Sequence, residues 1–226
     1  MGVERVERVE GRGTWSIGIS TLLTLPTLST RLFFHFTPES PAVRASQPAL
    51  LAAARVIAET RDEMVTQWLD RLGDRVAAAP TIPRPTVERE FRLIIDVLAE
   101  MVGPLRREVR AVWQEACRHY GHTASARGLA AGEVVEELLQ LRDLLTRQLA
   151  PIVAAMRARQ GMAILLRLNR VLDHGVAVAV VGYTDALVAA LLGQNGLPPS
   201  ASEHDAAEID RQLDALEASL AAISRH

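Results

Sequence analysis

Lysine is missing from this chain of 226 residues, because all 25 of its basic residues are arginine. This absence excludes chemistry that needs a lysine amine, such as Schiff-base formation or phosphate binding by a P-loop. It is also typical of a GC-rich bacterial genome. Cysteine occurs once, as Cys117, so no disulfide can form within the chain and a reducing cytoplasm is the expected compartment.

Aromatic residues are scarce too, at 4% of the chain against 49% for hydrophobic residues, so we expect a largely aliphatic core. The formal net charge of -2 argues against a nucleic-acid partner, which would require a concentration of basic residues. The sequence contains no GxSxG, GxGxxG, CxxC or HExxH motif. It therefore predicts a protein that is not an enzyme and holds no cofactor.

Apolar residues recur from Ala49 onward at the spacing of one helix face. Loops that contain proline or glycine interrupt this pattern, and Pro151 is expected to kink or split the helix that contains it. No strand-type alternation competes. The predicted fold is an all-α antiparallel bundle of about six helices with an irregular N-terminal arm. The expected helices cover residues 49–79, 86–102, 104–126, 131–159, 162–193 and 202–223.

The segment 162–193 is the most apolar, with no charged residue between His174 and Asp185. A helix of this kind is either a central core helix or a membrane span, and Asp185 favours the core helix. Small residues follow one another at spacings of four, three and four, which predicts that a neighbouring helix approaches closely. These residues are Gly175, Ala179, Gly182 and Ala186.

The first 45 residues differ from the rest of the chain. They begin with glutamates among the valines and continue with a hydroxyl-rich stretch broken by Pro26, which disfavours both a signal peptide and a transmembrane helix. We expect an irregular arm that is either disordered or bound to a partner through its aromatic side chains. The candidate partner-binding residues in this arm are Trp15, Phe33, Phe34 and Phe36.

The chain divides on this basis into an arm of residues 1–45, a bundle of residues 46–193, and a linker with a last helix over residues 194–226. That last helix carries apolar residues at heptad spacing, among them Leu213 and Leu220. We expect this seam to bind a partner, which could be a second copy of the chain.

One group of side chains could hold a metal ion. Glu115, His119 and His122 share a helix face if the helix continues through Gly121, and imidazole and carboxylate groups are metal ligands. The alternative is that two partly exposed histidines lie near a helix end, where the helix dipole favours them. No other residues repeat the spacing, so we expect no metal.

A longer pattern points to a known family. A helix ends in Tyr120-Gly121, Gly128 follows seven residues later, and the next helix carries Glu137 four residues ahead of Leu141-Arg142. This arrangement resembles the RsbRD-type N-terminal sensor domain, the input module of RsbT co-antagonists and of some bacterial histidine kinases. The resemblance covers about residues 50–192 and extends to Trp68 and Tyr183. It departs from the family at Ala124, where an arginine is usual.

The resemblance implies an input module that acts by contact, because only 33 residues follow Gly193 where such proteins continue into an output domain. The residues themselves suggest that Gly121 ends a helix in the left-handed conformation, that Gly128 begins a turn, and that Glu137 reaches a neighbouring helix or loop. We therefore expect a cytoplasmic sensor or regulatory module that binds signalling proteins. The alternative is an accessory structural subunit docked through its arm, on the cytoplasmic face of a membrane complex.

Overall fold

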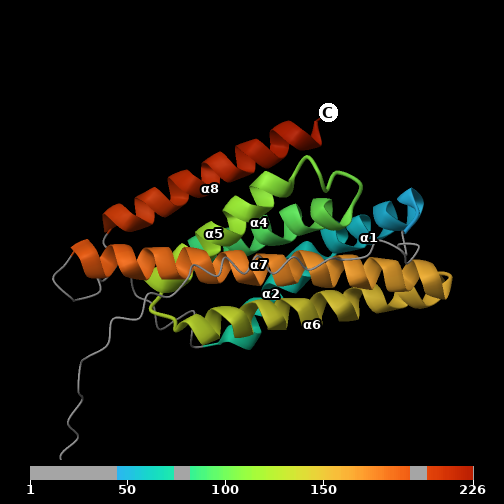
Figure 1. Cartoon of the computed structure of the whole chain (residues 1–226), viewed down its shortest axis with the longest axis horizontal. Helices are drawn as coiled ribbons and strands as arrows, with labels where there is room; N and C mark the ends of the chain where they lie inside the picture. The colour runs from blue at the N-terminus through green and yellow to red at the C-terminus, as the bar shows by residue number, and fades with distance from the viewer. Residues whose placement is uncertain (1–44, 74–81, 194–202, 226) are drawn as a thin grey trace, which may run out of the picture. The chain divides into compact units, whose positions relative to one another are not determined.

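The computed structural model describes residues 45–73, 82–193 and 203–225, and within these ranges it is all-α, as the sequence predicts. Figure 1 shows that α7 runs alongside α6 in the opposite direction, while α8 lies beside α4 and α5. The helices are α1 (Gln47–Glu59), α2 (Arg61–Leu72), α4 (Arg84–Val102), α5 (Arg110–Ala126), α6 (Ala131–Ala155), α7 (Ala158–Gly193) and α8 (Glu203–Ser224).

The described residues form seven helices where the sequence indicates six, because the first expected helix is two. The break falls at Thr60, whose backbone N–H and side-chain hydroxyl both donate to the Val56 carbonyl. A threonine hydroxyl that bonds to the preceding turn competes with the regular helix ladder and favours a bend. The helices α1 and α2 therefore meet at an angle that the apolar spacing alone does not reveal.

Helix boundaries differ from expectation at two other places. The residues from Pro104 to Val109 form turns, so α5 begins only at Arg110. Pro151 neither splits nor ends α6, which continues to Ala155; the chain leaves the helix at Met156, whose backbone is extended. Proline removes one N–H donor, and this helix continues for four residues beyond the loss.

The core is mainly aliphatic, but the few aromatic residues in the described part concentrate at its centre. Their rings are larger than any aliphatic side chain, so they fill the space where the helices meet. The aromatic side chains that are less than 2% exposed are Trp68, Phe91, Trp113 and Tyr120.

The helices α5 and α7 approach so closely that backbone meets backbone. A Cβ atom added to Gly182 would lie 2.2 Å from the Arg118 carbonyl oxygen, and one added to Gly121 would lie 2.0 Å from the Ala179 carbonyl oxygen. The row of small residues on α7 thus does what the sequence predicts. The expectation for Gly121 was wrong: this glycine lies inside α5, where it is needed for close packing rather than to end the helix.

The last helix packs on the bundle of its own chain. Ile209, Leu213 and Leu216 of α8 are buried, and Leu213 is fully so. At the surface, Arg89 of α4 forms ion pairs with Asp214 at 2.6 Å and with Glu217 at 2.7 Å. The apolar heptad positions of this helix therefore pack against other helices of the same chain. Leu213 is buried there and is not accessible to a partner, so the expectation that it binds one was wrong. Leu220 is only partly buried, at the edge of the same contact.

Candidate functional site

The turn between α5 and α6 brings together the residues of the candidate site. Gly128 has a left-handed backbone with φ of +79°, its N–H donates to the Ser125 carbonyl, and the Leu129 N–H donates to the Ala124 carbonyl. This pair of bonds is the Schellman motif, which glycine favours because it lacks a Cβ atom. The predicted turn at Gly128 is therefore confirmed. It places Arg127, the last residue before the glycine, over the first turns of α6.

Arg127 and Glu137 form a buried ion pair. The two guanidinium nitrogens Nη1 and Nη2 donate to the two carboxylate oxygens at 3.1 and 2.8 Å, and both side chains are 0% exposed. Burial lowers the pKa of Arg127, but the nearby Tyr120 and Glu137 outweigh it and raise that pKa. The arginine is therefore charged at every accessible pH, and it neutralises a carboxylate that would otherwise be stranded in the core.

Two further donors bind Glu137. The Tyr120 hydroxyl of α5 donates to carboxylate oxygen Oε2, and the Trp68 indole N–H of α2 donates to the Glu137 backbone carbonyl at 3.0 Å. Burial, followed by the charge of Glu137, raises the pKa of Tyr120 well above its usual value, so the hydroxyl keeps its proton and remains a donor. Glu137 thus ties α2, α5 and α6 together, which agrees with the expectation that it reaches a neighbouring element.

Aromatic rings surround this pair. The Trp68 and Phe91 rings stack with centroids 3.8 Å apart, and the Arg127 guanidinium lies 5.6 Å from the Tyr120 ring centroid and 6.0 Å from that of Phe91. A cation over an aromatic face is attracted by the ring quadrupole, most strongly when both are removed from water. The aromatic side chains therefore surround the buried Arg127–Glu137 pair, which together with the His119–Glu90 pair is called the charged centre below.

A second buried pair lies beside the first. His119 Nδ1 is 2.7 Å from Glu90 Oε1, and the Thr123 hydroxyl donates to the His119 carbonyl. Burial lowers the pKa of His119, but the hydrogen bond and charge of Glu90, together with the backbone of Ile209 in α8, outweigh it and raise that pKa. The histidine thus joins α5 to α4 through Glu90, within the core.

The structure does not assemble the three metal-ligand candidates into a site. His119 faces Glu90 in the core, whereas the Glu115 side chain is 64% exposed and lies beside Arg118. His122 is exposed. Among the described residues, no group of three or more histidine, cysteine or acidic side chains is placed to hold a metal ion.

The other residues singled out from the sequence pack in the core or form contacts between helices. Leu141 is fully buried, Arg142 of α6 donates to Asp173 of α7, and Tyr183 packs at the edge of the core. Cys117 is buried, and burial raises its pKa well above the usual value, so its thiol stays protonated. Trp15, Phe33, Phe34 and Phe36 lie outside the described residues.

Sequence reasoning missed Arg127, Glu90 and Phe91 as members of the charged centre. Arg127 directly precedes the predicted turn and lies seven residues after Tyr120, which places the two on one side of a helix. That spacing was the available signal. Glu90 gives no comparable signal, because a single glutamate in an amphipathic segment is more often on the solvated face.

A groove of about 460 Å³ opens where α8 diverges from α4. Its arginines, Arg61, Arg89 and Arg92, each form ion pairs with carboxylates of the same chain. Leu93 and Leu220 contribute apolar surface between them. The arginines of this groove are thus engaged in ion pairs, among them those that hold α8 and α2 against α4.

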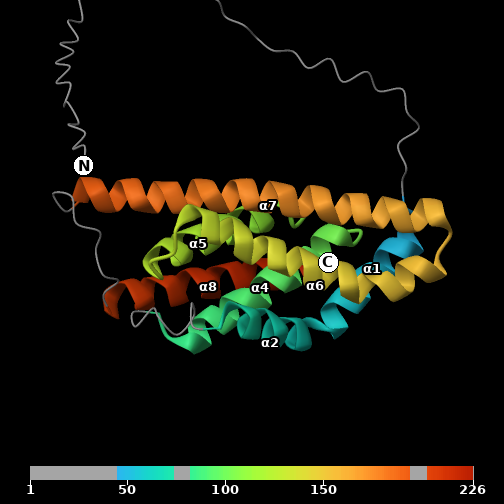
Figure 2. The same ribbon diagram turned by 90° about the horizontal axis from the view of Figure 1, so that it is seen from below.

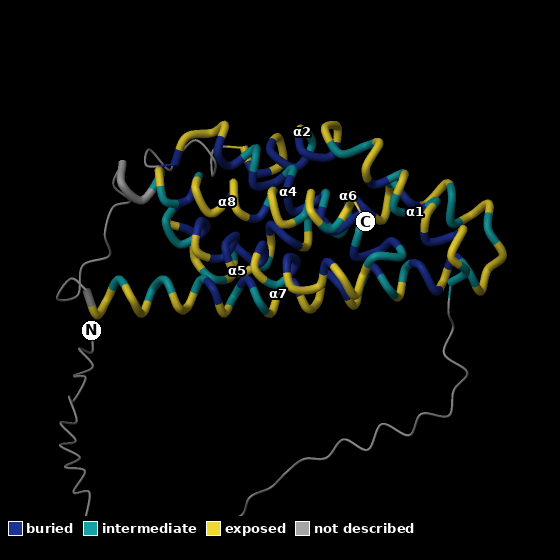
Figure 3. The backbone as a smooth tube through the Cα atoms, turned by 90° about the horizontal axis from the view of Figure 1, so that it is seen from above, coloured by how far each residue is buried: buried dark blue, intermediate teal, exposed yellow. Residues whose placement is uncertain are grey.

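The outer side of α7 carries a different surface. Figure 2 shows α7 along one edge of the bundle with no described helix on its outer side, and Figure 3 shows exposed positions repeating along it. Several large apolar side chains there face solvent, namely Val181 (50% exposed), Val188 (46%), Leu191 (47%) and Leu192 (83%). By length and composition the helix could cross a membrane, with a mean hydropathy of 2.0 over a window of which 17% is buried.

No family model matches the sequence, and no curated protein or solved structure is significantly similar to it. The resemblance to the RsbRD-type sensor domain therefore stays a prediction. It concerns Trp68, Tyr120 and Glu137, which come from three different helices and meet in one hydrogen-bonded group.

Proposed function

We propose that the protein is a non-catalytic sensor or regulatory module that works through protein–protein contacts, with the outer side of α7 as its contact surface. The observation that carries this proposal is the row of exposed apolar side chains on a helix whose inner side is tightly packed. Contiguous apolar patches on soluble proteins commonly mark interaction sites. The RsbRD-like pattern and the absence of lysine agree with a bacterial module of this kind, and the single cysteine agrees with a cytoplasmic one.

The charged centre supports a structural role for its polar residues. Glu137 and Glu90 are 0% and 1% exposed, and each already holds a basic partner. A buried carboxylate that is paired with a basic side chain holds helices in place. A substrate would have to displace the basic side chain before it could contact the carboxylate. We therefore assign binding to the surface and rigidity to the centre.

The test compares what the protein retains from an extract of its source organism, prepared in mild detergent. The tagged full chain is used alongside the Val181→Asp, Val188→Asp double variant and a control, Leu51→Asp, which changes an equally exposed apolar residue on α1. We expect signalling proteins or the chain itself to be retained by the wild type and the control, and lost from the double variant.

Retention of the same proteins by all three forms would exclude the outer side of α7 as the contact surface. If those proteins were a stoichiometric set of membrane-complex subunits, the accessory-subunit alternative would replace the regulatory one. Circular dichroism of each form checks that the substitutions leave the helices intact.

A further inference from the structure

Seven residues on α7 form a continuous seam that the described part of the chain leaves exposed. They follow one another at alternating spacings of four and three, and all seven are exposed, whereas Gly175, Ala179 and Gly182 on the opposite side are buried against α5. The members of this seam are Arg170, His174, Ala177, Val181, Thr184, Val188 and Leu191.

Alternation of four and three is the pattern by which one helix packs against another in a coiled coil. In the sequence this pattern is hidden, because α7 is apolar on most sides and several registers look equally good. Exposure separates them: the inner register packs against α5, whereas the residues of the outer register are exposed, with His174 hydrogen-bonded to Gln114 of α5 at 3.1 Å. The seam thus has the spacing of a helix-binding surface, and apart from Thr184 it is apolar from Ala177 to Leu191.

The composition of the seam suits a close neighbour. From Ala177 to Leu191 it has no charge, and its members are small or β-branched apart from the terminal leucine. The one hydroxyl in this stretch, that of Thr184, already donates to the Val180 carbonyl one turn earlier. Its remaining surface is a methyl group, so a second helix could cover Thr184 without stranding that hydroxyl proton.

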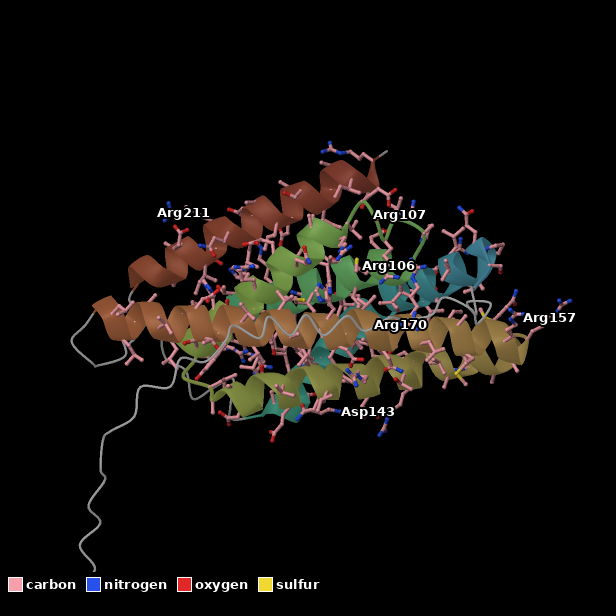
Figure 4. All side chains as sticks on the ribbon, in the orientation of Figure 1. Arg106, Arg107, Asp143, Arg157, Arg170 and Arg211 are labelled. Carbon is pink, nitrogen blue, oxygen red and sulfur yellow. The ribbon has the colours of Figure 1, made fainter. Side chains whose placement is uncertain are left out.

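Charge decides between the two orientations of a self-complementary pair. A parallel pair in register would set Arg170, which Figure 4 labels on α7, against its own copy, and His174 likewise. An antiparallel pair with its twofold axis between Gly182 and Tyr183 sets Ala177 opposite the second copy's Val188, and Val181 opposite its Thr184. In that register Arg170 lies beyond the last contact, and no like charges of the seam face one another.

We propose that two copies of this chain associate through these seams, with their α7 helices antiparallel and Ala177 of each copy opposite Val188 of the other. This inference rests on the proposed function, because it takes the outer side of α7 as the contact surface and names its occupant. A closed pair of this kind buries the same patch on both copies, as twofold symmetric dimers do.

Light scattering on the purified full chain after size-exclusion chromatography tests the association. We expect a mass twice the 24.7 kDa of one chain for the wild type and for the Leu51→Asp control, and the mass of one chain for the Val181→Asp, Val188→Asp double variant. A monomeric wild type would overturn the inference. So would a dimer that the double variant leaves intact.

Introduced cysteines test the orientation. The native Cys117 is buried, so oxidation reports on new thiols at the surface. We expect the Ala177→Cys chain and the Val188→Cys chain to form a disulfide when mixed, and neither to do so alone. Cross-linking of the Ala177→Cys chain alone would show a parallel pair and overturn the antiparallel register.

The two proposals fail in different ways. A monomeric wild type that still retains a distinct protein through Val181 and Val188 would overturn self-association and keep the contact surface. A wild type that is monomeric and retains nothing through those residues would overturn both.

Discussion

Arg127 and Glu137 meet through two parallel hydrogen bonds at a point where neither side chain reaches solvent. They lie on either side of the turn between two helices: Arg127 follows the end of α5, and Glu137 lies within α6. Removing a charge from water costs several kcal/mol, which only a well-made pair can offset. The fold around this turn therefore depends on each partner more than on any single apolar contact.

The Glu137→Gln variant should lose much of its stability, because Arg127 would remain buried without a countercharge. Breaking a buried pair at one partner costs about 3–5 kcal/mol. We expect a loss of that size in the free energy of unfolding, measured by urea denaturation followed by circular dichroism.

Two controls separate the stranded charge from the loss of packing. Adding Arg127→Met to Glu137→Gln removes both charges and should recover a large part of the loss. The Asp143→Asn change, which breaks an exposed ion pair with Arg71, should have far less effect. Figure 4 labels Asp143 on α6, the helix that also carries Glu137. Equal losses for Glu137→Gln and Asp143→Asn would contradict the importance of the buried pair.

A second prediction concerns the close approach of α5 and α7. The Gly121→Ala change would place a methyl group 2.0 Å from the Ala179 carbonyl oxygen, so the helices must separate. We expect a loss of about 1–3 kcal/mol or more, in line with other overpacked cores, visible as a lower melting temperature.

Gly132 provides the matched comparison, because a methyl group added there would meet no atom within 4 Å. Since alanine favours a helix over glycine, the Gly132→Ala variant should be as stable as the wild type or slightly more so. A melting temperature that fell equally in both variants would contradict the importance of the contact with α7, because only Gly121 faces that helix.

The stability of the protein should depend on pH through His119. Its pKa is raised in the folded state from the ordinary value of 6.5, so the folded protein binds this proton more tightly than the unfolded chain does. The stability that it contributes is complete below about pH 6.5 and is lost as the pH rises through the folded-state pKa. The His119→Gln variant should lack this decline in urea denaturation measured from neutral to alkaline pH.

His122 should act in the opposite direction. Partial burial lowers its pKa, so its contribution to stability is present above the ordinary value and is lost as the pH falls through the folded-state pKa. The His122→Gln variant should therefore be relatively more stable than the wild type on the acid side. Identical pH profiles for the wild type and both variants would rule out these histidines as the source of the dependence.

The attachment of α8 should weaken when Arg89 loses its charge. Arg89 pairs with both Asp214 and Glu217, and the Arg89→Gln variant removes both ion pairs while keeping a polar side chain. We expect faster hydrogen exchange of the α8 amides and little change in α6. The Arg211→Gln control, whose ion pair with Glu208 lies within α8, should leave exchange close to that of the wild type. Equal exchange in both variants would show that apolar contacts alone hold the helix.

The fold class could be predicted from the sequence because helix periodicity is a local property. The row of small residues on α7 predicted the close contact with α5 for the same reason: a single helix face displays it. The break at Thr60 could not be predicted this way, since it arises from a side-chain hydrogen bond to one carbonyl. The heptads of α8 predicted that the helix packs, but heptad spacing does not say whether the partner is another chain or the same one.

The candidate centre was only half visible in the sequence. Tyr120, Gly128 and Glu137 stood out as a pattern, but their meeting depends on how three helices pack. Arg127 was overlooked because an arginine beside a glycine turn usually points to solvent. Only the packed structure shows that the Arg127 side chain points into the core, where it donates to the Glu137 carboxylate.

The contacts of α8 also bear on how the chain is made. Asp214 lies 125 residues beyond the Arg89 that it pairs with, and a ribosome adds about 5–20 residues per second. The partner of Arg89 is thus synthesised roughly 6–25 s after it. Throughout that interval the sides of α4 and α5 that α8 will cover are bare. Until α8 has been made, the nascent bundle must therefore avoid aggregation through this open flank.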